Sequence, residues 1–353
     1  MATNEHKSKN VIFLALSGIG NLLMQLPTIE AFKKANPQAR VTVWVAPRGT
    51  KAIAESCSYI DSVIEAPIKA SPAEHMRMSW KLARHRFDTG IVLSPGQLVK
   101  SATYLFLAGV PTRIGNAYLF QGRSESGFLL THAITEDPDL HDIEQNLRLL
   151  EPLEVPTQKS WGKSYHFNVP AEHVTKAQEY LSSQDIPSDR KLVAIHAGSA
   201  PAFLWKRWPL DRFAAVARTL INEQNVHILL LGGPDEEDQK EQLHQLIGLP
   251  NITNVSTPLL TTAAILQQSS YLLTNDSGIM HLAAAVGTPV FGLYGPTDEK
   301  KTGPRGDKSI VIRAAGTTPV YATETNYDIG ETSHPTMLEI TPELVLETIQ
   351  SNS

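Results

Sequence analysis

The sequence predicts two doubly wound α/β domains, each built on a parallel β-sheet. Its 353 residues suffice for about two domains of ordinary size. Short apolar runs alternate with longer helical patterns, which is typical of β-α-β units, and this alternation occurs in both halves of the chain. A hydrophobic content of 42% and a charged content of 19% allow two normal hydrophobic cores.

The first half contains four expected strands, each followed by a helical stretch. We place the strands at 10–16, 41–46, 62–65 and 90–94, and the helices near 21–35, 50–57, 72–86 and 99–108. Residues 115–140 are rich in Gly, Ser and polar residues and show no clear period, whereas 141–151 predict a helix. Pro152, Pro156 and Pro170 then indicate the connection between the domains.

The second half repeats the pattern with six expected strands. They lie at 191–196, 226–232, 252–255, 271–275, 289–294 and 309–313, with helices near 171–183, 211–223, 235–247, 261–269 and 278–286. Thr341-Pro342-Glu343 combines a cap, a proline and an acid, as at the start of a last helix.

This organisation predicts three parts of the chain. An N-terminal domain spans 1–165, a C-terminal domain spans 166–335, and 336–353 form a C-terminal helix that we expect to pack back on the N-terminal domain. Parallel sheets of this kind bind ligands at the carboxyl ends of their strands, where the strand order reverses. With two such domains, the expected active site is the cleft between them.

Composition limits the cellular compartment and the classes of binding partner that we expect. A net charge of −5 argues against nucleic acid. Cys57 is the sole cysteine, which excludes an internal disulfide framework and a Cys-rich metal site and fits a reducing compartment. The first ten residues are polar, and no apolar run approaches the roughly 18 residues of a spanning helix. We therefore expect a cytoplasmic protein.

One stretch of the first half is basic. Residues 69–123 contain eight Lys and Arg side chains against two acids, Glu74 and Asp88. Such a stretch forms either a solvated helix surface or a face for an anionic partner, such as a phosphorylated glycolipid. The second alternative predicts peripheral contact with a membrane.

The strongest local pattern is the strand, turn and helix over 271–286. Asp276 or Ser277 can cap the helix, and Gly278 allows a ligand to approach the backbone. Free N–H groups at the helix start form an anion site suited to a diphosphate, and His281 lies on the first turn. Taken alone, such a segment is more often a capped helix with a buried histidine than a binding site.

Other loops follow neighbouring strands. A second glycine-rich turn begins at Tyr294 and Gly295. After strand 191–196, Ser199 and Lys206 lie in a loop with two tryptophans, where Lys206 either neutralises a departing diphosphate or is a surface lysine. Asp235, Glu236 and Glu237 follow strand 226–232. One of these acids can hold a ribose or adenine edge, and at least two of them complement a helix dipole.

The first half offers a weaker signal. Strand 10–16 runs into Ser17-Gly18-Ile19-Gly20-Asn21, a tight turn that opens a helix. The pattern G-x-G lacks a third glycine at the expected place, so the dinucleotide-binding fingerprint is incomplete.

Together these segments resemble glycosyltransferase family 9, the heptosyltransferases of lipopolysaccharide core assembly. The resemblance covers most of the chain. The motifs that carry it are S-G-I-G-N-L-L-x-x-L-P at 17–27, G-V-P-T-R-I-G at 109–115, the helix from 141, H-A-G-S at 196–199, K-R-W-P at 206–209, D-S-G-I-M-H-L-A at 276–283, G-T-P at 287–289 and Y-G-P-T at 294–297.

The resemblance implies a GT-B fold and an inverting transfer, usually from ADP-heptose, to a phosphorylated sugar lipid, without a metal or other cofactor. Lys206 is then catalytic and neutralises the diphosphate. The donor contacts implied with it are Ser199, Glu236, Asp276, Ser277, Gly278, Ile279, His281 and Gly295, and the acceptor contacts are Ser17, Gly20, Arg48 and Arg113.

The sequence departs from the family at one position. The family commonly carries an aspartate after the glycine of the first loop, as the base that deprotonates the acceptor hydroxyl, whereas this chain has Asn21. An amide cannot take a proton near neutral pH. Either another residue such as His132 or Asp88 is the base, or Asn21 positions the acceptor, or the chain binds donor without transfer. A sugar-nucleotide epimerase on the same fold is a further alternative.

Overall fold

The structure is a computed structural model that divides into two compact units, Met1–Tyr165 and His166–Ser353. The described residues are 9–47, 49–67, 72–96, 98–117, 119–120, 123–124, 127–319 and 332–352.

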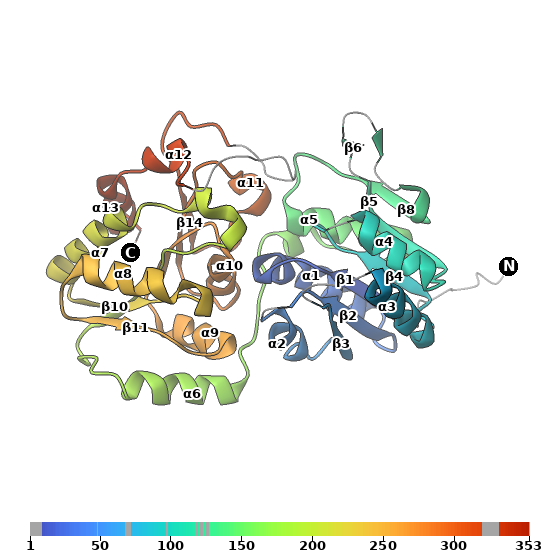
Figure 1. The fold of residues 1–353 in the computed structure, drawn as a ribbon, viewed down its shortest axis with the longest axis horizontal. Helices are drawn as coiled ribbons and strands as arrows, with labels where there is room; N and C mark the ends of the chain where they lie inside the picture. The colour runs from blue at the N-terminus through green and yellow to red at the C-terminus, as the bar shows by residue number, and fades with distance from the viewer. Residues whose placement is uncertain are drawn as a thin grey trace. The chain divides into compact units, whose positions relative to one another are not determined.

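The N-terminal unit is a six-stranded parallel sheet in the order β3-β2-β1-β4-β5-β8, with helices on both faces (Figure 1). Buried apolar residues fill β1 and β2, and α3 contacts α4 on one face while α1 contacts α5 on the other. Its elements are β1 (Asn10–Ala15), α1 (Ile19–Ala35), β2 (Arg40–Val45), α2 (Thr50–Glu55), β3 (Ser62–Glu65), α3 (Pro72–His85), β4 (Thr89–Val92), α4 (Leu98–Leu107), β5 (Thr112–Ala117), β6 (Leu119–Phe120), β7 (Arg123–Ser124), η1 (Gly127–Leu129), β8 (His132–Thr135), α5 (Asp142–Leu147), η2 (Arg148–Leu153) and η3 (Lys159–Gly162).

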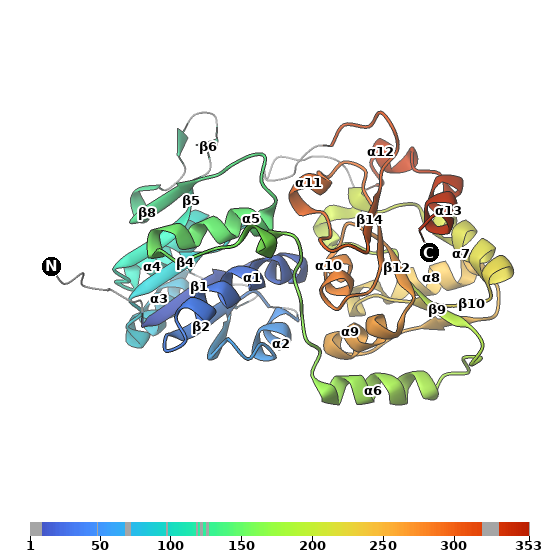
Figure 2. The same ribbon diagram turned by 180° about the vertical axis from the view of Figure 1, so that it is seen from behind.

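The second unit repeats this plan in the order β11-β10-β9-β12-β13-β14, and Figure 2 shows it from behind. All neighbouring strands in both large sheets are parallel, so the predicted α/β class is confirmed. The elements are α6 (Ala171–Ser182), β9 (Lys191–His196), η4 (Pro201–Lys206), α7 (Leu210–Gln224), β10 (Val226–Leu230), η5 (Pro234–Glu236), α8 (Glu237–Ile247), β11 (Ile252–Asn254), α9 (Leu259–Gln268), β12 (Tyr271–Asn275), α10 (Gly278–Ala285), β13 (Val290–Leu293), α11 (Glu299–Thr302), β14 (Ser309–Ile312), α12 (Pro335–Leu338) and α13 (Pro342–Gln350).

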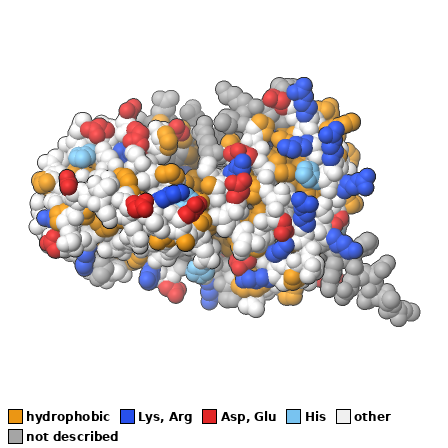
Figure 3. All heavy atoms as spheres, turned by 90° about the horizontal axis from the view of Figure 1, so that it is seen from below, with side chains coloured by type: hydrophobic (Ala, Val, Ile, Leu, Met, Phe, Trp, Pro, Cys, Tyr) orange, Lys and Arg blue, Asp and Glu red, His pale blue; other side chains and the backbone are white. Residues whose placement is uncertain are grey.

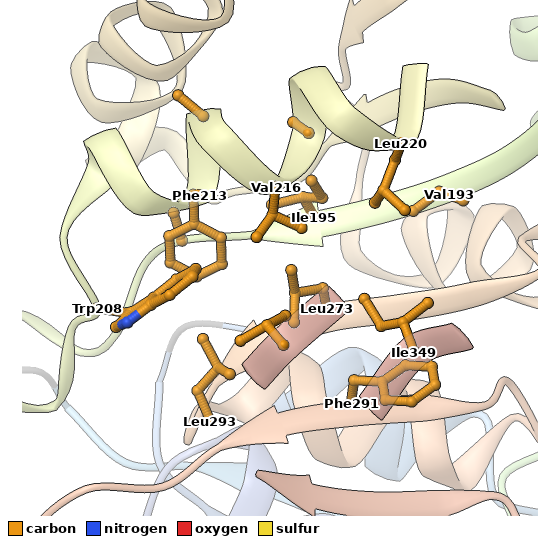
Figure 4. Packing of buried hydrophobic residues seen from close by; sticks show 14 of the residues in the cluster. Val193, Ile195, Trp208, Phe213, Val216, Leu220, Leu273, Phe291, Leu293 and Ile349 are labelled. Carbon is orange, nitrogen blue, oxygen red and sulfur yellow. The ribbon is translucent and has the colours of Figure 1, made fainter. Parts of the chain in front are cut away.

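The C-terminal helix α13 belongs to the core of the second unit. Val345 and Ile349 are fully buried, and α13 packs on α7. Figure 4 shows Ile349 beside Phe291, in the same cluster as Trp208 and Phe213, whose rings meet edge to face at 4.9 Å. The indole Nε1 of Trp208 also donates to the carbonyl of Ile340, at 2.9 Å. The expectation that this helix packs back on the N-terminal domain is therefore wrong, because its apolar stripe is buried against α7.

Each large sheet has a point where the strand order reverses. In the N-terminal unit, the chain moves from β1 to β2 on one side and later to β4 on the other, and in the second unit β10 and β12 flank β9 in the same way. Loops that leave neighbouring strands in opposite directions open a crevice at their carboxyl ends. In the N-terminal sheet the loops after β1 and β4 lie at such a crevice, and in the second sheet the loops after β9 and β12 do.

Candidate functional site

The carboxyl edge of the second sheet is built around the start of α10. The five residues of β12 are all buried, which fixes the strand, and the chain turns directly into α10 through Asp276 and Ser277. Ser277 is the N-cap, with its Oγ accepting from the Met280 N–H at 3.4 Å. Gly278 and Ile279 occupy the half-buried first turn. Backbone N–H groups and the helix dipole make this start a site for a negative charge.

An ion pair joins this helix start to the loop after β9. The Lys206 Nζ lies 2.7 Å from Asp276 Oδ2, and Asp276 is only 7% exposed. Burial raises the pKa of Asp276, but the Lys206 ammonium and the neighbouring hydrogen-bond donors together lower it by more, so the pKa lies below its ordinary value. Lys206 also lies over the rings of Phe203 and Trp205, at 5.1 and 5.5 Å from their centroids. The lysine therefore stands fixed beside the anion site.

His196 links three strand ends and was not assigned a role from the sequence. Its Nδ1 lies 3.1 Å from Ser277 Oγ and 3.2 Å from Thr274 Oγ1. Its Nε2 lies 3.2 Å from Glu236 Oε2. With the Nε2 proton donated to the Glu236 carboxylate, Nδ1 accepts from the Ser277 hydroxyl. The signal that reveals this residue is a histidine as the last residue of a buried strand, at the carboxyl edge.

Glu236 is held by backbone as well as by His196. Its Oε2 accepts from the Gly233 N–H at 2.9 Å, and its Oε1 lies 4.0 Å from the Arg207 guanidinium. Burial raises the pKa of Glu236, but the His196 hydrogen bond and the surrounding positive charge lower it to about 2. The carboxylate is thus ionised and braced at the end of β10, where it accepts hydrogen bonds.

Ser199 and Gly295 lie at the same edge, but their contacts are with other residues of the loops. The Ser199 hydroxyl donates to the Phe203 carbonyl at 2.8 Å and accepts from Arg207 Nε at 3.0 Å. A Cβ on Gly295 would lie 2.5 Å from the Met337 sulfur, so glycine allows α12 to pack on this turn. Both residues shape these loops through the contacts given above.

His281 is buried next to the ion pair and is neutral. Burial lowers its pKa to about 4; the Asp276 carboxylate opposes this shift and the Lys206 ammonium adds to it. The cationic charge at the helix start therefore comes from Lys206 and not from His281.

The carboxyl edge of the N-terminal sheet carries the Ser17 turn. Gly18 is the N-cap of α1, Gly20 is buried in the first turn, and the Asn21 side chain is half-buried without a hydrogen bond from any described residue. The Gln25 amide lies 3.5 Å from Ser17 Oγ and donates to the Ser94 carbonyl at 3.0 Å. The turn is thus tied to the end of β4.

Ser94 and Asn146 were missed from the sequence. The Ser94 N–H donates to Asn146 Oδ1 at 2.8 Å, and Asn146 Nδ2 donates back to the Ser94 carbonyl at 2.6 Å. Both residues are buried, and the pair fixes the loop after β4 to α5. A fully buried amide in the otherwise amphipathic helix at 141–151 is the signal that reveals it.

Several predicted residues are not brought to this edge. Arg113 is the second residue of β5, paired in register with Gly90 of β4, so it lies near the amino ends of the strands. Its guanidinium donates to the carbonyls of Leu129 and Val110, at 2.6 and 2.7 Å. Arg113 therefore lies at the edge of the sheet opposite the Ser17 turn, and its role as an acceptor contact stays a prediction.

The two alternative bases lie at the same far edge. Asp88 precedes β4 and accepts from the backbone N–H groups of Lys9 and Asn10, each at 2.8 Å. His132 is the first residue of β8. Neither is near the Ser17 turn along the sheet, which excludes them as bases there. Arg48 lies outside the described residues.

Two further findings concern the described part of the chain. Within it, no group of three or more His, Cys, Asp or Glu side chains is arranged to hold a metal ion. Among its helices, none is both long and apolar enough to cross a membrane.

Comparison with known proteins decides the family. Residues 75–327 match the sequence profile described as "Glycosyltransferase family 9 (heptosyltransferase)". The chain belongs to this family. Two similar relatives of this glycosyltransferase are lipopolysaccharide heptosyltransferase 2 of Salmonella typhimurium, 27% identical over 97% of both chains, and lipooligosaccharide heptosyltransferase 2 of Haemophilus influenzae, 26% identical over 96% of this chain and 97% of the relative.

Solved structures show the same fold. The ADP-heptose lps heptosyltransferase II of E. coli superposes with a TM-score of 0.75, at 22% identity over 97% of this chain and 98% of the other. A family 9 glycosyl transferase of Veillonella parvula gives a TM-score of 0.78, at 23% identity over 97% and 96%. The expected GT-B fold and the family resemblance are confirmed.

The close fit between Gly198 and Glu236 makes a first prediction for this family 9 enzyme. A Cβ on Gly198 would lie 1.7 Å from Glu236 Oε1, so Gly198→Ala must push the carboxylate away from His196. We expect a loss of about 1–3 kcal/mol in the free energy of unfolding, measured by urea denaturation, together with weaker nucleotide binding. Gly233→Ala is the matched control, since its Cβ would meet Glu236 only at 3.9 Å. Equal effects of both substitutions would contradict the prediction.

The buried neutral His281 makes a second prediction, on acid stability. Its pKa is about 4 in the folded protein against 6.5 for an ordinary histidine. As the pH falls from 6.5 to 4, this histidine binds a proton in the unfolded chain but not in the folded protein. The free energy of unfolding therefore decreases over this window. We expect His281→Gln to remove up to about 3 kcal/mol of the fall in unfolding free energy over this window. A stability profile of His281→Gln that matches the wild-type profile over this window would contradict the assignment.

Proposed function

We propose that the chain transfers a heptose from ADP-heptose to an anionic sugar of a lipopolysaccharide core, with inversion at the anomeric carbon. The observation that carries the proposal is the Lys206–Asp276 ion pair at the capped start of α10, on the carboxyl edge of a Rossmann-like sheet. A diphosphate leaving group needs positive charge and N–H donors at this point. The names of the similar relatives supply the heptose and its ADP carrier.

Each donor residue has a distinct role in this proposal. The N–H groups of the first turn, at Gly278 and Ile279, donate to the diphosphate, and Lys206 neutralises the charge that develops as the glycosidic bond breaks. Asp276 holds Lys206 in place, at 2.7 Å. Because the lysine and the helix start already supply positive charge, we propose that transfer needs neither a metal nor another cofactor.

A second group of residues shapes the nucleotide side. His196 fixes the Ser277 hydroxyl and the Glu236 carboxylate relative to each other, at 3.1 and 3.2 Å. Glu236 then accepts hydrogen bonds from a hydroxyl or amine of the nucleoside, as acids do at the ends of such strands. Ser199 and Gly295 support the surrounding loops through the contacts described above.

The acceptor side is proposed at the Ser17 turn. Ser17 and Gly20 line the turn, and Asn21 lies on the first turn of α1, where an acceptor hydroxyl would be oriented. The resemblance adds Arg48 as a partner for the acceptor's negative charge. A lipid-linked acceptor implies an enzyme of the cytoplasm that visits the inner face of the cytoplasmic membrane.

A transfer assay tests the proposal. The purified full chain is incubated with ADP-heptose, or with other nucleotide sugars, and a phosphorylated core glycolipid, with and without EDTA. We expect release of ADP and a glycosylated lipid of inverted anomeric configuration, unaffected by EDTA. With the fold intact by circular dichroism, failure to consume any nucleotide sugar would contradict it.

Asn21 favours a second candidate, a homologue that binds the donor without transferring it. An amide offers no proton acceptor where the family commonly has a carboxylate. This candidate predicts nucleotide binding by calorimetry with no turnover of any donor, both before and after Asn21→Asp. Turnover by the wild-type chain would eliminate it.

A further inference from the structure

The outer faces of α3 and α4 carry large apolar side chains exposed to water. Trp80 is 67% exposed, Met76 61%, Leu107 54% and Phe106 52%, and Val99 is half exposed. Isolated exposed apolar residues are ordinary, but a group on two neighbouring helices marks an interaction surface. We call these five residues, with the basic residues given below, the α3–α4 face.

The two helices present these residues in the same outward layer. α3 and α4 contact each other on one side of the sheet, and their inner residues Leu82, Leu98 and Leu105 are buried in the core beneath. At 3.6 residues per turn, Met76 and Trp80 share one helix face, and Val99 and Phe106 share another. Because the inner faces point to the sheet, the exposed residues of both helices point away from it.

Basic side chains are interleaved with the apolar ones. α3 carries Arg77, Lys81 and Arg84 and α4 carries Lys100, all exposed, against the single acid Glu74. The Arg84 guanidinium lies 5.6 Å from the Trp80 ring centroid. Figure 3 shows Lys and Arg side chains gathered, with apolar atoms between them, on the surface of the N-terminal unit. The face is therefore both apolar and positively charged.

We propose that the α3–α4 face docks on the surface of an anionic lipid bilayer. Tryptophan and phenylalanine partition into the boundary between headgroups and acyl chains, while Lys and Arg stems lie along it with their charges on anionic headgroups. A second copy of the chain fits this face poorly, since identical faces would place like charges opposite each other. An anionic membrane satisfies both the apolar and the basic side chains.

The placement suits a membrane-bound acceptor, and in this respect the inference rests on the proposed function. In a β-α-β unit the helix starts at the carboxyl end of the preceding strand. α3 and α4 follow β3 and β4, so they start at the sheet edge where the Ser17 turn follows β1. The first turn of α4, with Val99 and Lys100, lies at this edge, whereas Phe106 and Leu107 end α4 near the amino ends of the strands. A bilayer that covers the whole α3–α4 face therefore also reaches the edge where we place the acceptor.

Vesicle sedimentation tests the inference without any transfer reaction. The full chain is mixed with vesicles of phosphatidylcholine alone or of phosphatidylcholine with phosphatidylglycerol. We expect binding to the mixed vesicles only, weakened by salt. Arg77→Glu with Lys81→Glu should lower the partition coefficient by at least roughly tenfold. Trp80→Ser with Phe106→Ser should lower it similarly.

Matched variants on the second unit control for general effects. Lys176→Glu with Lys191→Glu changes the net charge equally, and Leu246→Ser with Leu338→Ser removes two other exposed apolar side chains. Both controls should bind like wild type, and all variants should keep their turnover on a lipid-free acceptor. The inference is overturned if the wild-type chain does not bind anionic vesicles. It is also overturned if light scattering shows a dimer that only the Trp80 and Phe106 substitutions dissociate. A failed transfer assay beside normal vesicle binding would instead reject the proposed function alone.

Discussion

Lys206→Ala is expected to lower kcat by about 100-fold or more while the protein still binds nucleotide. The lysine is fixed at 2.7 Å from Asp276 and beside the start of α10, where the charge of a departing diphosphate would develop. A group that acts mainly on this developing charge stabilises the transition state more than the bound donor, so kcat falls more than the affinity for the donor. Steady-state kinetics with ADP-heptose, together with nucleotide titration, would measure the two effects.

Stability must be separated from catalysis in this experiment. Removing Lys206 leaves the buried Asp276 carboxylate unpaired, which costs about 3–5 kcal/mol of unfolding free energy in comparable cases. The double variant Lys206→Met with Asp276→Asn removes both charges and should recover most of that stability. If Lys206 acts on the diphosphate, turnover stays low in the double variant. Recovery of turnover along with stability would show a purely structural lysine, and Lys300→Ala serves as an exposed control.

The second half of the chain was well predicted because its signals are local. Each site loop follows a buried apolar strand, and an apolar strand followed by Gly, Ser or Asp and then a helix is visible in the sequence. The sequence does not show which side chains of different loops contact one another. Lys206 and Asp276 are 70 residues apart, and His196 meets both Ser277 and Glu236 only because β9 lies between β10 and β12.

The first half was less well predicted, also for physical reasons. β8 is largely exposed, so its residues lack the alternation that marks a half-buried strand, and residues 115–140 were left without elements although β5 ends and β8 lies there. Arg113 stands in a recognisable motif, but which edge of the sheet a residue occupies depends on where its strand starts. Similarly, the apolar stripe of α13 predicts that this side of the helix is buried, but it does not show that α7 is the helix that covers it.

Asn21→Asp is expected to raise turnover by about 10²–10⁴-fold, the usual contribution of a general base. Asn21 lies on the first turn of α1, half-buried and without a hydrogen bond from any described residue, so an isosteric carboxylate needs no rearrangement. A helix start also favours a negative charge. The carboxylate would take the acceptor proton as the hydroxyl attacks the anomeric carbon, a step for which the amide has no free lone pair of sufficient basicity.

The pH profile and a truncation distinguish this role from a positioning one. A carboxylate base must be ionised, so the gain should vanish as pH falls below the ordinary aspartate pKa of about 4 and persist above it. Asn21→Ala should change wild-type turnover little, because no base is lost. If Asn21→Ala and Asn21→Asp both reduce turnover, the amide itself orients the acceptor. In that case the residue at position 21 binds the acceptor and does not remove its proton. The general base is then another group that reaches the acceptor hydroxyl.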